Sequence, residues 1–332
     1  MAEQECFAIF ALWIYCSMRR WFLLMLLFVS CGKHNDRSIS FYYWKTRFQL
    51  NEYEKETLAR NNVSTLYVRY CDVDVNGPIA PVSFDSTANN YNIIPVVFIR
   101  NRVFEKMNPD TLAKNIFNLI TSREVQFDCD WTERTRDNYF HFINTYKSLS
   151  KQRVSCTIRL HQVKYPKRTG IPPVDHGVLM YYNMGNIDAS AQSSIYENEI
   201  ARKYNAFIRD YPLTMDVALP IFSWGLKIRN GQVIELLNKI YFSHFENDPN
   251  FRPLRKDWFT AVNSCFKAGY YFEKGDAVKI ERVSEADLLE MAENVNRNSN
   301  KKLRNILFYD LDSTNLVQYE KDIFQKVLGG FN

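Results

Sequence analysis

The feature of this sequence that most constrains its fold is a repeated alternation of short apolar runs with longer amphipathic ones. Short apolar runs bounded by turn-forming residues are typical of buried strands, and apolar residues at helical spacing are typical of helices that cover a sheet. The predicted strands cover residues 39–48, 65–73, 94–100, 124–130, 154–160, 177–183, 215–222 and 305–311. The clearest predicted helices cover residues 52–61, 110–122, 134–151, 194–210 and 316–328.

About eight strand-then-helix units follow one another without a linker, and their number decides between two parallel architectures. Strands that alternate with helices form a parallel sheet covered by helices. Eight units over about 300 residues fit a closed (β/α)8 TIM barrel better than an open Rossmann sheet. The sequence also lacks the glycine-rich GxGxxG turn of dinucleotide-binding folds. We therefore predict a single barrel over residues 41–332.

Residues 225–300 interrupt this pattern. They contain a predicted hairpin around Arg229, Asn230 and Gly231 and several pieces without clear periodicity. We expect an irregular insertion in this part of the barrel. The sequence leaves open whether it is an inserted subdomain or a seventh helix with additions.

The composition restricts the classes of function. Apolar residues make up 46% and charged residues 24% of the chain, as in globular proteins. The net charge is only +5 and basic residues are scattered among acidic ones, whereas a nucleic-acid-binding surface concentrates lysine and arginine. We predict no nucleic-acid partner, no cofactor and no metal, because phosphate-binding loops and histidine ligand motifs are absent from the sequence. We also expect a monomer.

The N-terminus has the pattern of an export signal. Arg19 and Arg20 precede a short apolar run, residues 21–29, which is too short to span a bilayer. Cys31 follows this run, with small residues before it. The arrangement resembles the bacterial lipobox, in which the cysteine is diacylated and becomes the new first residue, although Phe28 stands where leucine is usual.

We therefore predict a lipoprotein-type signal peptide over residues 1–30 and a short tether over residues 31–40. A lipid on Cys31 would anchor the protein to a membrane of the bacterial cell envelope, in the periplasm or at the cell surface. Translation starts at Met1 or at Met18, because a second apolar run precedes the arginines. A plain signal peptide and an N-terminal membrane anchor are the alternatives.

Polar and aromatic side chains gather at the predicted carboxyl ends of the strands, where (β/α)8 barrels carry their active sites. Charged groups there are costly in a purely structural core, so we expect a ligand pocket, with intramolecular ion pairs as the alternative. For His161 the alternative is an ordinary rim histidine, and for Trp44 and Trp224 it is rim packing. The residues predicted to bind the ligand are Trp44, Arg69, Asp72, Arg159, His161, Asn183, Trp224 and Asp310.

The most informative segment runs from Val125 to Thr132. The period of two along a strand puts Asp128 and Asp130 on the same face. Two carboxylates on one face raise each other's proton affinity unless a cation lies between them. The pair therefore suits acid/base chemistry or a structural arginine clamp.

This segment resembles the fourth-strand motif of the family 18 glycoside hydrolases, which include chitinases and endo-N-acetylglucosaminidases. The motif is D-x-x-D-x-D-x-E, and Asp128, Asp130 and Trp131 match its second and third acids and a frequent following tryptophan. Residues 180–183, Met-Tyr-Tyr-Asn, fit the sixth-strand pattern M-x-Y-[DN] of the same family. Both matches fall on the expected strands of the predicted barrel.

The resemblance implies a carbohydrate ligand at the strand ends. In that family the middle aspartate and the tyrosine hold the N-acetyl group of the substrate, and this group itself attacks the anomeric carbon. Asp130 and Tyr182 would take those roles here, with Asn183 at the edge of the sugar. The predicted catalytic residues are therefore Asp128, Asp130 and Tyr182.

Several departures from the motif bear on activity. Val125 and Gln126 replace its first aspartate and its glycine, and Thr132 replaces the glutamate that serves as the catalytic acid. A threonine hydroxyl is too weakly acidic to protonate a glycosidic oxygen at useful rates. Glu133 is one position out of register and is expected to begin the next helix. The Ser-Gly-Gly type of third strand is also missing from residues 94–100.

Whether the chain is an enzyme therefore stays open. The leading hypothesis is glycoside hydrolysis with the acid relocated to another carboxyl at the strand ends. The alternative is a non-catalytic glycan-binding barrel that has lost the acid, and unrelated chemistry on a non-sugar is a third possibility, because a fold does not define a function. The candidate acids are Asp72, Asp128, Asp130 and Asp310. A pairing of Asp310 and Asp312, on the last strand, with Asp72 across the mouth of the barrel is one way to supply an acid from elsewhere in the site.

Overall fold

The computed structural model describes residues 37–79, 81–299 and 303–331. The predicted signal peptide, the lipid site at Cys31 and most of the predicted tether lie outside these residues, so they stay predictions. Within the described ranges, no helix combines the length and the apolar character that a membrane crossing requires.

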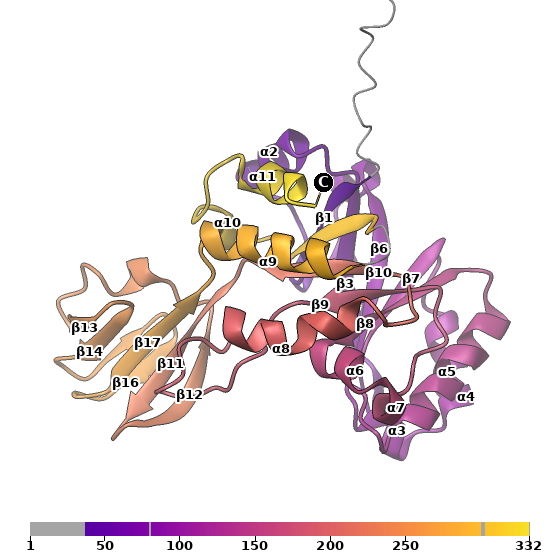
Figure 1. Cartoon of the computed structure of the whole chain (residues 1–332), viewed down its shortest axis with the longest axis horizontal. Coiled ribbons are helices and arrows are strands. Elements are labelled where there is room, and N and C mark those ends of the chain that lie inside the picture. Colours follow the sequence, from indigo (N-terminus) through magenta and orange to yellow (C-terminus); the bar gives the residue numbers. More distant parts are fainter. Residues whose placement is uncertain (1–36, 80, 300–302, 332) are drawn as a thin grey trace, which may run out of the picture. The chain divides into compact units, whose positions relative to one another are not determined.

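Eight parallel strands close into a barrel, which confirms the predicted (β/α)8 fold (Figure 1). The barrel closes at its first strand, which pairs in parallel with the second strand on one side and the last strand on the other. Seven of the eight strands end earlier than predicted, and for two of them, β7 and β9, this leaves Asp130 and Asn183 in loops just beyond the strand. The strands in spatial order are β1 (Ser38–Tyr43), β3 (Thr65–Asp74), β6 (Asn92–Ile99), β7 (Glu124–Asp128), β8 (Arg153–Arg159), β9 (His176–Met180), β10 (Met215–Pro220) and β18 (Asn305–Tyr309).

Helices cover the outside of the barrel. Successive side chains of β1 point alternately to the helices and to the interior of the barrel. Phe41 packs against Phe324 of the last helix, with ring centroids 5.2 Å apart. Tyr42, the next residue, donates a hydrogen bond of 2.6 Å to Gln126 of β7 in the buried interior. The helices are α2 (Glu52–Arg60), α3 (Val103–Lys106), α4 (Pro109–Phe117), α5 (Arg136–Leu149), α6 (Leu160–Lys164), α7 (Pro166–Thr169), α8 (Asn198–Ile208), α9 (Glu285–Asn298), α10 (Ser313–Leu316) and α11 (Ile323–Gly329).

All five predicted helices differ from the observed ones at one or both ends, and in two cases the structure shows the cause. The helix predicted over residues 110–122 begins one residue earlier, because Asn108 caps it and Pro109 takes the first helical position. The helix predicted over residues 316–328 is two helices, α10 and α11. The first of them begins before the predicted start because the side chain of Asp312 caps it.

The connection between β3 and β6 departs from the strand-then-helix pattern. Residues 75–91 hold the short strands β4 (Gly77–Pro78) and β5 (Ser83–Phe84) and the 3-10 helix η1 (Ser86–Asn90), but no α-helix among the described residues. β5 pairs in parallel with β2 (Arg47–Phe48). An irregular segment therefore lies where a barrel helix is expected.

Residues 223–282 form an antiparallel subdomain between β10 and α9, at the left of Figure 1. The predicted hairpin is confirmed, and its turn residues Asn230 and Gly231 have φ angles of 51° and 77°, which suit these two residue types. The subdomain has its own apolar core, and α9, which follows it, covers the barrel. Residues 225–300 therefore contain both an inserted subdomain and a barrel helix, the two options that the sequence left open. Its elements are β11 (Ser223–Arg229), β12 (Gln232–Asn238), η2 (Phe242–His244), β13 (Phe251–Arg255), β14 (Trp258–Ala261), β15 (Cys265–Lys267), β16 (Tyr270–Phe272) and β17 (Ala277–Arg282).

Candidate functional site

A cavity of about 320 Å³ opens at the carboxyl ends of β7, β8 and β9. This volume is in the range of small-ligand sites. The cavity brings together five residues predicted from the sequence and three that sequence reasoning did not select. Its lining consists of the predicted residues Asp130, Arg159, His161, Tyr182 and Asn183, together with Leu160, Met184 and Tyr204.

Arg159 compensates the two carboxylates of the fourth-strand segment. Its Nε donates a hydrogen bond to Asp130, and the buried Asp128 accepts one of 2.7 Å from the hydroxyl of Thr157. Burial raises the pKa of Asp128, the charge of Arg159 lowers it, and the charge of Asp130 raises it further. Of the two arrangements that the sequence allowed, the geometry is that of the arginine clamp.

Tyr182 and Asn183 form one wall of this cavity. The hydroxyl of Tyr182 donates a hydrogen bond of 3.2 Å to the sulfur of Met180, and burial raises the pKa of Tyr182 well above its usual range. The phenol is therefore a neutral donor. Asn183 has a φ of 53°, a left-handed conformation that asparagine adopts more readily than most residues, and its side chain is exposed at the cavity.

Tyr309, at the end of β18, is the centre of a cluster of aromatic rings, here called the aromatic floor, and it is not among the site residues selected from the sequence. Its ring centroid lies 5.5 Å from that of Trp44, 5.8 Å from that of Tyr182 and 5.8 Å from that of Phe222. Phe222 in turn lies 5.2 Å from Trp224. An aromatic residue at a strand end is equally typical of core packing, so only its position beside other aromatic rings identifies Tyr309.

Arg69 and Asp72 lie at the end of β3 and pair with each other. Nε of Arg69 donates a hydrogen bond of 2.7 Å to Asp72, and its guanidinium carbon lies 5.8 Å from the ring centroid of Trp44. Both residues line a separate cavity of about 170 Å³. The pairing of Asp72 with Asp310 that the sequence allowed does not form, because Arg69, three positions away on the same strand, already neutralises Asp72.

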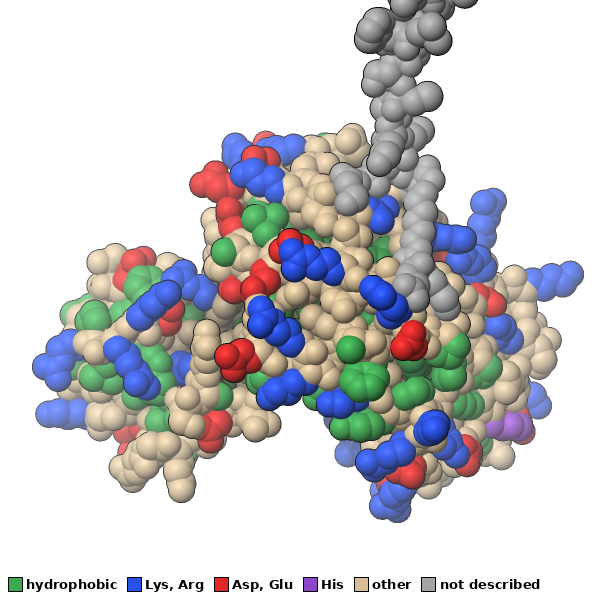
Figure 2. All heavy atoms as spheres, viewed as in Figure 1, with side chains coloured by type: hydrophobic (Ala, Val, Ile, Leu, Met, Phe, Trp, Pro, Cys, Tyr) green, Lys and Arg blue, Asp and Glu red, His purple; other side chains and the backbone are tan. Residues whose placement is uncertain are grey.

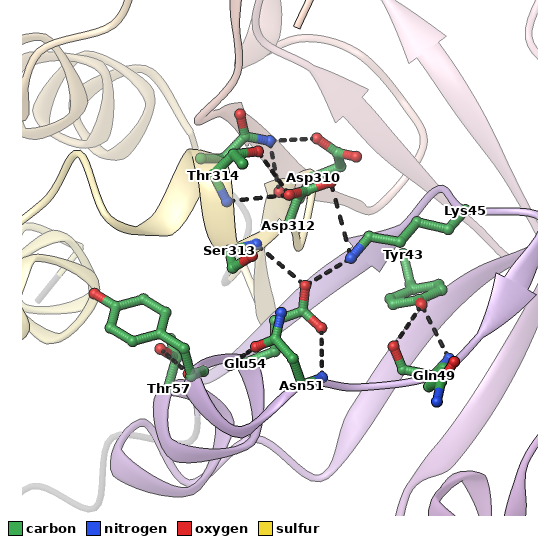
Figure 3. A network of polar contacts seen from close by, with 12 residues as sticks. Tyr43, Lys45, Gln49, Asn51, Glu54, Thr57, Asp310, Asp312, Ser313 and Thr314 are labelled. Atoms are coloured by element: carbon green, nitrogen blue, oxygen red, sulfur yellow. Dashed lines mark hydrogen bonds and ion pairs between the residues drawn. The ribbon is translucent and has the colours of Figure 1, made fainter. Parts of the chain in front are cut away.

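Asp310 and Asp312 follow β18 and have opposite environments (Figure 3). Asp310 is buried and accepts a hydrogen bond of 2.6 Å from Asn315, and its burial raises its pKa to about 6. Burial also opposes ionisation of Asp312, but hydrogen bonds from Lys239 and Thr314 outweigh it and lower the pKa of Asp312 to about 2. Lys239 belongs to the subdomain, so this contact ties the subdomain to the end of β18.

Lys45 links the end of β1 to the same network. Figure 3 shows its ammonium group between two carboxylates, 2.7 Å from Glu54 and 3.8 Å from Asp312. The backbone N–H of Ser313 also donates to Glu54, at 3.1 Å. These contacts join α2 to the start of α10, and the buried Glu54 is fully engaged by them.

Trp224 is held by the subdomain. Its indole N–H donates a hydrogen bond of 2.9 Å to the buried carboxylate of Glu281, which also accepts one of 2.9 Å from the backbone of Ser194. The other oxygen of Glu281 lies 2.6 Å from the ammonium group of the buried Lys279. One carboxylate therefore fixes both the indole and the loop between β9 and α8.

None of the three residues that follow Asp130 is in the lining of the cavity at the mouth. Trp131 is fully buried and donates a hydrogen bond of 2.8 Å to the carbonyl of Thr169, so it is a packing residue. Thr132 is exposed, and its hydroxyl lies 3.3 Å from that of Thr135. Glu133 forms an exposed ion pair of 3.2 Å with Arg168.

The described ranges 37–79, 81–299 and 303–331 hold no group of three or more His, Cys, Asp or Glu side chains arranged to bind a metal ion. Across the middle of the face in Figure 2, Lys and Arg side chains alternate with Asp and Glu side chains. Mixed charge of this kind is typical of a solvated surface.

No protein-family model matches the sequence, and no curated protein matches it. Several solved structures nevertheless share the fold. The spore cortex-lytic enzyme SleL of Bacillus cereus superposes with a TM-score of 0.59 at 12% identity, covering 89% of this chain and 74% of that chain. The class V chitinase of Nicotiana tobaccum superposes with a TM-score of 0.53 at 8% identity, covering 89% of this chain and 99% of that chain.

Group II chitinase catalytic domain 2 of Ostrinia furnacalis gives a TM-score of 0.51 at 9% identity, covering 89% of this chain and 96% of that chain. Mutants of the two chitinases have been solved in complex with NAG4 and (NAG)5, respectively. At these identities the likeness establishes the fold alone, and it agrees with the (β/α)8 barrel predicted from the sequence.

Proposed function

We propose that this barrel binds an oligosaccharide of N-acetylated hexoses at its mouth and does not hydrolyse it. The observation that carries the proposal is Thr132, which has no carboxyl and stands at the position where the motif has its acid. A general acid must come within hydrogen-bond reach of the glycosidic oxygen. Glu133, the next residue, does not line the cavity at the mouth and forms an exposed pair with Arg168.

The four carboxyls considered as relocated acids are all engaged within the protein. Two of them, Asp72 and Asp130, are ion-paired, and the other two are buried and hydrogen-bonded. Their partners are Arg69 for Asp72, Thr157 for Asp128, Arg159 for Asp130 and Asn315 for Asp310.

The class of ligand follows from the mixed chemistry of the mouth. An aromatic floor suits the apolar face of a sugar ring, and the phenol of Tyr182, the amide of Asn183 and the Arg159–Asp130 pair suit its hydroxyl and acetamido groups. The chitinases of the same fold that were solved with NAG4 and (NAG)5 support an N-acetylated sugar. The proposed setting is the bacterial cell envelope, supported by the signal-like residues 19–31 alone.

The test is to restore the missing acid. Isothermal titration with the N-acetylglucosamine pentamer should show binding to residues 32–332, and chromatography should show no shorter products. Thr132→Glu should yield shorter products, because it returns a carboxyl to the acid position, while the isosteric control Thr132→Gln should not. Cleavage by the unmodified protein, or absence of pentamer binding, would contradict the proposal.

Hydrolysis with Asp310 as a relocated acid is the second candidate. A pKa of about 6 keeps a useful fraction of this carboxyl protonated near neutral pH, as a general acid requires. If the unmodified protein cleaves the pentamer, Asp310→Asn should abolish cleavage and leave binding intact. Cleavage that survives this change would exclude Asp310 as the acid.

A further inference from the structure

The outer wall of the barrel carries a second cavity at the β3–β6 connection, whose described residues include no α-helix. Tyr70, Ile93 and Pro95 of these strands line it, and the hydroxyl of Tyr70 donates a hydrogen bond of 3.0 Å to the carbonyl of Leu119 in the loop after α4. The irregular segment 84–91 forms the opposite side. This side groove has a volume of about 580 Å³, larger than the cavity of about 320 Å³ at the mouth.

Three aromatic rings, those of Tyr70, Phe84 and Tyr91, line the side groove. The rings of Tyr70 and Phe84 are nearly parallel, inclined by 28° with centroids 6.4 Å apart. Phe84 is 41% exposed, yet its backbone is held by the pairing of β5 with β2 and its ring lies 5.6 Å from that of Phe48. The platform is therefore ordered before a ligand arrives, which reduces the entropy lost on binding.

Polar groups from both sides of the side groove complement this platform. Asn89 and Thr121 are exposed, and Ser122 lies beside Thr121. Asp85 caps η1 through one carboxylate oxygen, which accepts a hydrogen bond of 2.9 Å from the N–H of Thr87. Its other oxygen accepts no hydrogen bond from the described residues, and Asp85 is the one charged side chain in the described lining.

We infer that the side groove is a second oligosaccharide-binding site, separate from the mouth. A sugar ring offers an apolar face to the aromatic platform and hydroxyl groups to Asp85, Asn89 and Thr121. A lipid chain or an apolar peptide side chain would leave these polar groups without partners, at a cost in free energy. The choice of a sugar rests on the proposed function of the mouth, whereas the place of the site does not.

The separation of the two sites makes them distinguishable. Ile93 and Pro95 of β6 line the side groove, whereas the cavity at the mouth lies beyond the ends of β7, β8 and β9, and the two cavities share no lining residue. One long polysaccharide chain that contacts both sites would be retained more strongly than a short oligomer, because the second contact is intramolecular.

The experiment counts binding sites with the N-acetylglucosamine pentamer by isothermal titration, using residues 32–332. Two sites per chain are expected. Phe84→Ala with Tyr91→Ala should weaken one of them by about tenfold or more, since stacking contacts are removed. Phe117→Ala is the matched control, because this partly exposed phenylalanine lies on α4 outside the side groove.

A second groove variant removes the risk of disturbing the packing on Phe48. Asn89→Ala with Thr121→Ala deletes only exposed polar groups and should also weaken the side-groove site, with an unchanged melting temperature. The mouth variant Asn183→Ala should weaken the other site alone. Mouth and side groove are thereby tested independently.

The outcomes separate the two proposals. One site that is sensitive to Asn183→Ala but not to the groove variants would overturn the side-groove inference and leave the proposed function standing. One site that is sensitive only to the groove variants would support the inference and overturn the proposed function. No binding of the pentamer would overturn both.

Discussion

Replacement of Arg159 by leucine should destabilise the protein in a strongly pH-dependent way. The Arg159 side chain is 23% exposed and pairs with Asp130, which is 57% exposed, while Asp128 nearby is buried. After the change, Asp130 can turn to water, so its lost ion pair costs less than about 1 kcal/mol. Asp128 cannot do so and keeps only the hydrogen bond from Thr157.

The main loss therefore comes from the buried carboxylate of Asp128. Removing one partner of a buried charge typically costs several kcal/mol, and we expect a decrease of about 3 kcal/mol in the free energy of unfolding at pH 8. The pKa of Asp128 is already raised by burial in the native protein and should rise further without Arg159. A folded state with a raised carboxyl pKa binds more protons than the unfolded chain, so the variant regains stability as the pH falls toward the ordinary value near 4.

Urea unfolding followed by circular dichroism at pH 8 and pH 5 measures this difference. The destabilisation relative to the native protein should shrink to about 1 kcal/mol at pH 5. Combining Arg159→Leu with Asp128→Asn should relieve most of it at pH 8, because asparagine still accepts the Thr157 hydrogen bond without a charge. Arg168→Leu is the control, since Arg168 is 71% exposed and its pair with Glu133 should matter little.

The reasoning is refuted if the loss from Arg159→Leu is equal at both pH values. It is also refuted if Asp128→Asn gives no relief, because Arg159 would then stabilise the barrel by packing of its aliphatic stem rather than by its charge.

Three further predictions concern other parts of the molecule. Asp310→Asn should raise the free energy of unfolding at pH 7 by up to about 3 kcal/mol. The reason is that the carboxyl of Asp310 has a pKa of about 6 in the folded state, so the native protein loses stability as the pH rises from 4 through 6. In thermal melts the stability gained by the variant should therefore vanish at pH 4. Glu281→Ala should lower the free energy of unfolding by about 3 kcal/mol, because Lys279 stays buried without the carboxylate of Glu281. The change should also shift the fluorescence of Trp224, which loses its hydrogen bond to Glu281. An unchanged melting temperature would argue against a buried ion pair. Cys31→Ser should release the full-length protein from membranes in cell fractionation, and a variant that stays bound would disprove the lipid anchor.

The sequence indicates the place of the candidate site but not the pairing of its residues. Asp130, Arg159 and Tyr182 are foreseeable as a group, because each follows a strand and parallel strands end at the same rim. Their partners are less foreseeable. The sequence allows a pairing of Asp72 with Asp310 across the mouth, and the structure pairs Asp72 with Arg69 on its own strand.

Aromatic residues show the same limit. Tyr309 and Trp131 both lie near strand ends in the sequence, yet Tyr309 packs among the aromatic rings at the end of β18, whereas Trp131 is fully buried and bonded to Thr169 of α7. Composition and strand period do not distinguish an aromatic residue that packs in the core from one available to a ligand, because both roles cover one face of the ring.

The sequence by itself determined the barrel and the threonine at position 132, where the motif that the segment resembles has a glutamate, because strand and helix periodicity and residue identity are local properties of the chain. Only the tertiary structure decided that Arg159 clamps Asp130, that Tyr309 joins an aromatic floor and that a side groove opens beside Phe84. These features depend on which distant segments pack together. Such contacts are set by the packing of the whole barrel rather than by any single stretch of sequence.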